Sequence, residues 1–361
     1  AKQGINFLNS KTGDAIRFLE LLTQKYDVAV ANPPYTDSSD FGPELKKFVN
    51  TNYKKPYKFH SNLYATFIKR CCEFVDEKGK VALVHPPTFM YIKSFEDVRK
   101  FIIEKMHINL FVEWGYLGMF NPLARVDSAM FVVEKERNKD SAVFIKLNDL
   151  YEGKRYDVLF EAYEDLLNKQ YNSRIYFIDQ SKLKTIEGWP FIYWISDRFR
   201  EKFKEKTLDF YVKNSQGMSV SNGERYQRFH WEVTKELISY NHRLDKKKWV
   251  PFAKGGPFNK WYGNNWLLVN WYNNGEELKN FPKAVIRNEY YYFVKGITYS
   301  SSGSKGSSFR YLPENFLFSG GGPSITMKDG IPLLGYLCGF LNSNMCLYLL
   351  DCLNPTVNTT Q

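Results

Sequence analysis

The chain has 361 residues, of which 43% are hydrophobic and 25% charged, and its 50 Lys and Arg against 39 Asp and Glu give a net charge of +11. These proportions exclude an intrinsically disordered chain, and the length favours two domains over one. No apolar run reaches the roughly 18–20 residues of a transmembrane helix, and the first residues lack the pattern of a secretory signal.

Two compositional features bear on the partner and the compartment. Aromatic residues reach 17%, and a basic, aromatic-rich chain suits a polyanion that offers flat bases for stacking, although an AT-rich genome would enrich the same residues. The five cysteines include no Cys-x-x-Cys pair, and the five histidines have no metal-binding spacing. We therefore expect a cytoplasmic protein with reduced cysteines, no metal site and no membrane association.

The first 150 residues alternate between strand and helix patterns. Strands are predicted over 5–8, 27–31, 80–84, 108–114, 128–134 and 142–147, and helices over 16–22, 62–75 and 95–105. The last two strands flank a polar turn at 136–141, which predicts an antiparallel hairpin at one edge. This order predicts an α/β fold with a doubly wound, mainly parallel sheet.

The character of the sequence changes near residue 150. Residues 151–210 are predicted to form a helical connector, with amphipathic segments over 161–170 and 197–206. From 211 to 361 the chain is rich in Gly, Asn, Ser and aromatic residues, with short apolar runs at 266–270 and 290–294 and a helix over 333–353. We expect domains over 1–150, 151–210 and 211–361, the last being a loop-rich α+β domain.

Asn32-Pro33-Pro34-Tyr35 is the motif that carries chemistry. It directly follows a strand of buried type, where open α/β sheets bind their ligands. The two prolines end the strand and remove two backbone donors, so that the Asn32 amide oxygen and the Pro33 carbonyl can both accept from one exocyclic amine. With Tyr35 as a flat face for a base, this arrangement suits methylation of an adenine N6 amine. A Pro-Pro turn that only caps the strand is the alternative.

The tetrapeptide resembles the Asp/Asn-Pro-Pro-Tyr/Phe signature of amino-methyltransferases that use S-adenosylmethionine. Nearly the whole chain is similar to the adenine-specific DNA methyltransferases of BREX phage defence, of PglX type, and to related type IIG restriction–methylation enzymes. The further motifs that carry this resemblance lie at 62–67, 80–84, 118–122, 188–194, 216–219, 223–226, 260–265, 307–311 and 353–356. The resemblance implies a Rossmann-like methyltransferase sheet, a helical connector and a target-recognition domain.

The resemblance also implies roles for particular residues. The Asn-Pro pair of the tetrapeptide would bind the target amine, with Asn32 also beside the cofactor, and Tyr35 would stack on an adenine flipped out of the duplex. Phe120 would close the other face of that base, although a single Phe in an apolar loop is commonly a core residue. Asp14 and Ala15 would bind the cofactor, with Asp14, at the end of a strand, receiving its adenine amine; the alternative for Asp14 is a helix N-cap.

One part of the family pattern has no counterpart in this sequence. The family places a Gly-rich cofactor loop and an acidic ribose ligand on two strands ahead of the Asp14 segment, whereas thirteen residues precede Asp14 here. We therefore expect the sequence to be part of a longer enzyme and to bind cofactor poorly alone. The run His85-Pro86-Pro87 resembles the tetrapeptide without its Asn and aromatic residue, so we expect no catalytic role there.

A basic, aromatic-rich segment in the last domain is the candidate surface for duplex DNA. Six basic and five aromatic residues fall within 243–262, against one acid, and a Ser/Gly-rich loop at 300–308 suits close approach to a phosphate backbone. Each basic residue alone is commonly a solvated surface charge, so the expectation rests on the group. The candidate DNA-binding residues are Arg225, Lys246, Lys247, Lys248, Lys254, Lys260, Trp261, Lys305 and Arg310.

Together these observations predict a site-specific DNA adenine-N6 methyltransferase that uses S-adenosylmethionine and marks host DNA in a phage-defence or restriction system. Double-stranded DNA is the expected partner, with other phage-defence proteins as further candidates. Two alternatives stay open. One is a protein glutamine-N5 methyltransferase, which shares the tetrapeptide, and the other is a non-catalytic DNA-recognition or assembly module.

Overall fold

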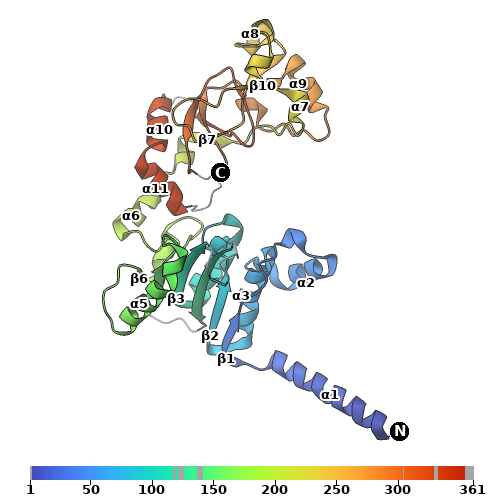
Figure 1. Ribbon diagram of the computed structural model, residues 1–361, viewed down its shortest axis with the longest axis vertical. Coiled ribbons are helices and arrows are strands. Elements are labelled where there is room, and N and C mark those ends of the chain that lie inside the picture. Colours follow the sequence, from blue (N-terminus) through green and yellow to red (C-terminus); the bar gives the residue numbers. More distant parts are fainter. Residues whose placement is uncertain are drawn as a thin grey trace. The chain divides into compact units, whose positions relative to one another are not determined.

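A computed structural model describes residues 2–116, 119–120, 126–135, 141–303, 305–328 and 332–353, with side chains described from residue 12 onward. The chain forms two compact units, Ala1–Lys204 and Glu205–Gln361, which are described separately below (Figure 1). The segment predicted as a helical connector, 151–210, lies mostly within the first unit and adds a strand to its sheet.

The first unit is built on a six-stranded sheet in the order β1-β2-β4-β3-β5-β6. The strands are β1 (Tyr26–Ala31), β2 (Val75–His85), β3 (His107–Tyr116), β4 (Asp127–Glu134), β5 (Ala142–Lys146) and β6 (Ile175–Ile178). β1, β2, β3 and β5 run in one direction, whereas β4 and β6 are antiparallel to their neighbours. The predicted α/β class with a mainly parallel sheet is confirmed.

The predicted edge hairpin of the last two strands is wrong. β4 lies between β2 and β3 and pairs with both, while β5 pairs with β3 and β6. Ala129, Phe131 and Val133 of β4 are buried on one face, and Met130 and Val132 line the other. A strand with apolar side chains on both faces suits the interior of a sheet, and the short polar turn after it does not reveal that position.

Helices cover the two faces of this sheet unequally. The helices of this unit are α1 (Lys2–Thr23), α2 (Pro43–Tyr53), α3 (Leu63–Phe74), α4 (Glu96–Lys105), α5 (Arg155–Leu167) and α6 (Asp197–Glu201). α3 and α4 pack on one face, in a core that includes Ile68 and Phe131. α5 packs on the other face over β3 and β5, around Trp114 and Ile145. On that second face Val30 stays exposed, and Ala82, Val84, Met130 and Val132 stay partly exposed.

The predicted strand over 5–8 is also wrong, because these residues belong to α1. Apolar residues at 5, 8, 15, 16, 19 and 22 recur at helical spacing, which a four-residue window cannot reveal. The predicted helix over 16–22 is the carboxyl-terminal part of the same helix.

The second unit holds two four-stranded sheets, in the orders β13-β9-β10-β8 and β12-β11-β14-β7. The first consists of β8 (Gln227–Phe229), β9 (Trp249–Ala253), β10 (Leu267–Asn270) and β13 (Leu317–Phe318). The second consists of β7 (Val212–Ser215), β11 (Gly296–Tyr299), β12 (Phe309–Leu312) and β14 (Ser324–Met327). The helices are α7 (Gly223–Tyr226), α8 (His242–Asp245), α9 (Tyr272–Lys279), α10 (Leu334–Leu341) and α11 (Asn344–Leu353).

Each of these sheets has its own core, around Phe252 and Trp271 in the first and around Ile297 in the second, where α10 and α11 pack. The helix predicted over 333–353 is interrupted between α10 and α11. There Asn342 accepts from the Phe309 N–H at 3.0 Å and donates to the Phe309 carbonyl at 2.8 Å. Among the helices of the described residues, none has both the length and the apolar character that crossing a bilayer requires.

Candidate functional site

Two loops leave the first sheet at the same edge. β1 and β2 are parallel, with Ala31 beside Leu83, so Asn32-Pro33-Pro34-Tyr35 after β1 and Pro86-Pro87 after β2 lie at one edge. The tetrapeptide therefore stands at the carboxyl end of a parallel strand, as the sequence predicted. The strand is less buried than its apolar sequence indicated, since Val30 is 76% exposed on the uncovered face of the sheet.

Asn32 and Tyr35 form a hydrogen-bonded pair within this loop. The Tyr35 hydroxyl donates to Oδ1 of Asn32 at 2.9 Å, which orients the amide oxygen. Asn32 is exposed, Tyr35 is partly buried, and Pro33 between them is buried. Partial burial raises the pKa of Tyr35, so its hydroxyl stays protonated and keeps donating at neutral pH.

The amino-terminal end of α3 holds the tetrapeptide in place. Asn62 caps α3 by accepting from the Tyr64 N–H at 3.2 Å, and its Nδ2 donates to the Tyr35 carbonyl at 3.2 Å. The Leu63 N–H donates to the Thr36 carbonyl at 3.0 Å. An Asn ahead of a helical pattern is a sequence signal for a cap, but nothing in the sequence indicates the second bond, so Asn62 was missed as a supporting residue.

Two buried side chains fix the loop after β2. His85 is fully buried with Nδ1 2.9 Å from the Pro86 carbonyl, and this burial lowers the pKa of His85 to about 4. Arg99 of α4 donates to the Phe89 carbonyl at 2.7 Å and, through two nitrogens, to the Gly188 carbonyl at 2.9 and 2.7 Å. These contacts make the loop a fixed neighbour of the tetrapeptide at the shared edge.

The structure gives less support to the other catalytic and cofactor candidates. Phe120 is 53% exposed, and its flanking residues 117–118 and 121–125 lie outside the described residues. Asp14 and Ala15 are exposed in the interior of α1, so Asp14 is neither at the end of a strand nor the N-cap of a helix. The roles of all three residues stay predictions.

The described residues of the first unit do not by themselves form a site that fits S-adenosylmethionine. α1 is exposed from residue 12 to residue 23. The open sheet face carries a depression of about 160 Å³ whose lining, from Val30 to Val132, is entirely apolar. An adenosyl group needs hydrogen-bond partners for its ribose and base, which this lining does not supply. In the described ranges, no three His, Cys, Asp or Glu side chains are grouped as metal ligands.

In the second unit, β9 separates lysines that form one cluster in the sequence. The lysines at 246–248 precede β9 and Lys254 follows it, which puts about 17 Å of strand between them. Lys247 and Lys248 line a hollow that also holds Glu276 and Glu277. The basic cluster is therefore two groups with different surroundings.

The aromatic candidates near these lysines also divide. Phe258, Trp261 and Tyr262 are 45%, 55% and 59% exposed, whereas Trp249 and Phe252 are core residues at 8% and 0%. The exposed rings of the 258–262 segment are therefore accessible for stacking on a base, whereas the buried aromatic residues of β9 are not.

Several basic candidates already have partners in the protein. Arg225 pairs with Glu277 at 2.7 Å, and Lys260 donates to the Asn342 carbonyl at 2.9 Å. Lys305 is exposed on its Ser/Gly-rich loop.

Arg310 differs from the other candidates because it is 1% exposed. Its guanidinium donates to the hydroxyls of Ser308 at 3.2 Å and Ser300 at 3.3 Å, and to the Asn259 carbonyl at 3.3 Å. These contacts join three segments of the unit. We infer that Arg310 stabilises the loops around it instead of contacting a phosphate.

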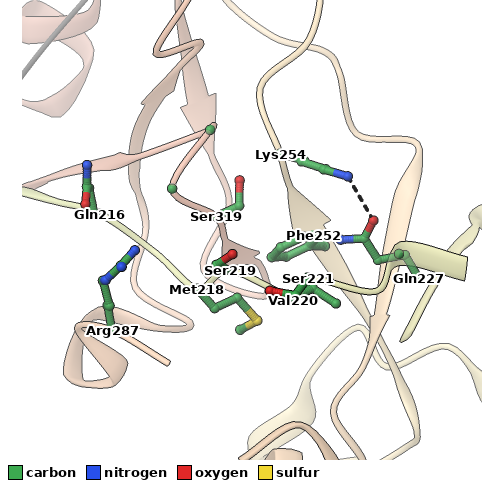
Figure 2. Close-up of a pocket in the computed structure, with 13 residues that line it drawn as sticks. Gln216, Met218, Ser219, Val220, Ser221, Gln227, Phe252, Lys254, Arg287 and Ser319 are labelled. Carbon is green, nitrogen blue, oxygen red and sulfur yellow. Dashed lines mark hydrogen bonds between the residues drawn. The ribbon is translucent and has the colours of Figure 1, made fainter. Parts of the chain in front are cut away.

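Sequence reasoning missed Arg287 and Gln227, which line a pocket together with Lys254 (Figure 2). Neither residue belongs to a basic cluster or a motif. Their association depends on the packing of segments that are distant in the sequence.

The sheet of the first unit, with Asn-Pro-Pro-Tyr at the carboxyl end of a parallel strand, defines a Rossmann-like methyltransferase fold. Two solved structures are similar in fold to most of the chain, over both units. The type IIL restriction-modification enzyme MmeI, in complex with DNA, has a TM-score of 0.54 at 10% identity and covers 90% of this chain and 43% of its own. The type ISP enzyme LlaGI, with a DNA substrate mimic, has a TM-score of 0.51 at 13% identity. The match covers 88% of this chain and 31% of the LlaGI chain.

The chain is similar in sequence to the PglX and BrxX adenine-specific methyltransferases. It is 30% identical over 361 residues to PglX of Lacticaseibacillus casei (strain Zhang), covering 95% of this chain and 29% of that protein. It is 29% identical over 350 residues to BrxX of Escherichia coli O9:H4 (strain HS), covering 94% and 27%. Residues 2–120 also match the family described as Eco57I restriction-modification methylase. The chain thus spans less than a third of the length of these two relatives.

Proposed function

We propose that the chain supplies the target-base pocket and the DNA-recognition unit of an adenine-N6 DNA methyltransferase. The enzyme would use S-adenosylmethionine and mark host DNA in the cytoplasm, within a BREX or restriction-modification system. The Asn32–Tyr35 pair at the carboxyl edge of the sheet carries this proposal. The names of the relatives, and the DNA held by the MmeI structure, support it.

The chemistry would take place on the exocyclic amine of an adenine flipped out of the duplex. Asn32 Oδ1, oriented by Tyr35, and the Pro33 carbonyl would accept the two N6 protons and so localise the lone pair on nitrogen. The Tyr35 ring would stack on one face of the base and Phe120 on the other. S-adenosylmethionine would supply an electrophilic methyl group. The N6–C bond would form as the sulfonium S–C bond breaks, with S-adenosylhomocysteine as the leaving group, and the amine would lose one proton.

The remaining candidates belong to the same proposal. Asp14 and Ala15 would contribute to cofactor binding once further residues complete that site. In the second unit, the DNA contacts would come from the exposed or partly exposed basic and aromatic side chains Arg225, Lys246, Lys247, Lys248, Lys254, Lys260, Trp261 and Lys305.

The test is substitution of Asn32 in the complete enzyme that contains this chain. Asn32→Ala removes the oriented acceptor and is expected to lower N6-methyladenine formation by about 10²-fold or more. Asn32→Asp keeps an acceptor oxygen and is expected to retain more activity than Asn32→Ala. Both rates would be measured as methyl transfer to duplex DNA, with sequencing of the modified position.

Methylation that survives Asn32→Ala at the wild-type rate would sink the proposal. Duplex binding by the chain distinguishes it from a glutamine-N5 methyltransferase, which needs no DNA. Binding without methyl transfer by the complete wild-type enzyme would instead favour a non-catalytic recognition module.

A further inference from the structure

We propose that a pocket in the second unit binds a backbone phosphate of duplex DNA between Lys254 and Arg287. The proposal rests on the proposed function, in which DNA is the substrate, and assigns a site that the methylation chemistry itself does not require. The pocket has a volume of about 490 Å³. It lies between the end of β9, the segment 216–223 and the loop 319–321 (Figure 2).

The charge of this pocket is entirely positive among the described residues that line it. Lys254 and Arg287 are its ionisable side chains, and they stand on opposite sides of the pocket in Figure 2. Lys254 donates one hydrogen bond, to Oε1 of Gln227 at 3.1 Å, which leaves two further N–H donors on its ammonium group. Two exposed cations that face one cavity without a carboxylate favour an anion between them.

Hydroxyl groups between the two cations add neutral donors. Ser319 is 5% exposed, and its Oγ accepts from the Gly322 N–H at 3.0 Å, so its own O–H can donate into the pocket. Ser219 is exposed, and its backbone is fixed by two hydrogen bonds of 2.9 Å with Val285. Hydroxyl donors combined with cations are typical of contacts to DNA phosphates.

The walls of the pocket are held rigidly. A Cβ atom on Gly217 would lie 1.8 Å from the Phe318 carbonyl oxygen, and one on Gly322 would lie 2.4 Å from the Gly255 nitrogen. Both glycines are therefore required for the close approach of the segments that form the pocket. Phe252 and Met218 close the floor at 0% and 1% exposure. A preformed site loses little conformational entropy when a phosphate binds.

Two other hollows of the second unit are less suited to a phosphate. The hollow on the other side of the Lys254–Gln227 pair includes Glu224 and Glu232. The hollow beside Lys247 and Lys248 includes Glu276 and Glu277, as described above. Because these carboxylates would repel a phosphate, the pocket between Lys254 and Arg287 is better suited to an anion than either of these two hollows.

The test measures affinity of the complete 361-residue chain for a panel of unrelated duplexes by fluorescence polarisation over a range of salt concentrations. The double variant Lys254→Gln/Arg287→Gln is expected to weaken binding to every duplex, on the order of tenfold for each cation. It should also lower the slope of log affinity against log salt by about 1 for each cation. The charge-matched control Lys182→Gln/Lys204→Gln, in the first unit, should leave the slope unchanged.

Gly320 offers a second test with its own control. A Cβ atom at Gly320 meets nothing within 4 Å, so Gly320→Ala should bind DNA normally, whereas Gly320→Asp puts a carboxylate into the pocket and should weaken binding. An unchanged salt slope in the double variant, or a loss confined to one DNA sequence, would overturn the phosphate site. The salt slope of the chain tests the phosphate site, whereas methyl transfer by the complete enzyme with Asn32→Ala tests the proposed function, so failure of each appears in a different measurement.

Discussion

Tyr35 contributes two groups to the tetrapeptide loop, and their roles can be separated. Its hydroxyl donates to Asn32 Oδ1 at 2.9 Å, and its ring meets the ring of Tyr64 edge-on with centroids 6.4 Å apart. In the proposed pocket the hydroxyl orients the amide, while the ring stacks on the target base. A conservative substitution can remove the first role and leave the second.

Tyr35→Phe is therefore expected to lower the methylation rate roughly fivefold, about the value of one neutral hydrogen bond, with little change in KM for DNA. Tyr35→Ala also removes the stacking surface, which is worth about 1–3 kcal/mol per base, and should lower the rate by a further factor of about 5 to 150. Initial rates of methyl transfer by the complete enzyme would measure both effects. Equal losses for the two variants would contradict the stacking role of the ring.

His85 is a residue whose burial makes stability depend on pH. The rings of Tyr64, Phe89, Phe111 and Phe131 surround it, and burial lowers its pKa to about 4 from an unfolded value of about 6.5. The unfolded chain thus binds a proton more readily than the folded chain. The stability that His85 contributes is fully present above pH 6.5 and is lost as the pH falls towards 4.

We expect His85 to reduce the free energy of unfolding by about 2 kcal/mol between pH 7.5 and pH 5. Urea unfolding at the two pH values would measure this, with His85→Leu as the variant that flattens the decline. Glu113, whose pKa burial raises, acts in the opposite sense, so the informative quantity is the difference between wild type and variant. An identical decline in His85→Leu would show that His85 does not cause it.

At the scale of elements, Arg99 ties α4 to the loop after β2. Its guanidinium donates to the carbonyls of Phe89 and Ile92 at 2.7 and 2.8 Å and to that of Gly188 at 2.9 and 2.7 Å. Burial lowers the pKa of Arg99 to about 10, so it stays charged at neutral pH. One side chain thus satisfies three backbone carbonyls and fixes the wall beside the tetrapeptide.

Arg99→Met leaves those carbonyls without their donor and is expected to lower the free energy of unfolding by about 3 kcal/mol. The free energy of unfolding of Arg99→Lys should lie between those of the wild type and Arg99→Met, because one ammonium group cannot reach all three carbonyls in the same geometry. Arg70, which lies over the exposed side of the Phe74 ring on α3, provides the control, and Arg70→Met should cost about 1 kcal/mol or less. Equal losses from both positions in urea unfolding would contradict the bridging role of Arg99.

The elements that the sequence predicted correctly are those defined by local pattern. The strand before Asn32 and the helix after Asn62 follow from apolar runs and from the residues that end or cap them. The place of β4 between β2 and β3 depends on pairing with strands distant in the chain, which no local pattern contains. The same limit applies to the sites. Asn32 and Tyr35 are three residues apart in the sequence, whereas Lys254 and Arg287 line one pocket only because distant segments pack together in the second unit.

At the scale of the whole molecule, the first unit exposes apolar side chains on β1 and on α1. β1 is an edge strand with Val28 and Val30 exposed at 55% and 76%, and the depression beside it is lined by apolar residues of β1, β2, β3 and β4. Ile16 and Phe18 of α1 are 62% and 60% exposed. Large exposed apolar surfaces and unpaired strand edges favour association between molecules.

We therefore expect the 361-residue chain to self-associate through β1, and Val30→Lys to reduce this association. The substitution should change the free energy of unfolding by about 0.5 kcal/mol or less, because the side chain is 76% exposed and a lysine is tolerated on a strand edge. Sedimentation velocity over a range of protein concentrations would measure the association. Leu244→Lys, at an 80% exposed apolar position of the second unit, is the matched control. If both substitutions reduce association equally, general surface charge is responsible, and the role of β1 is refuted.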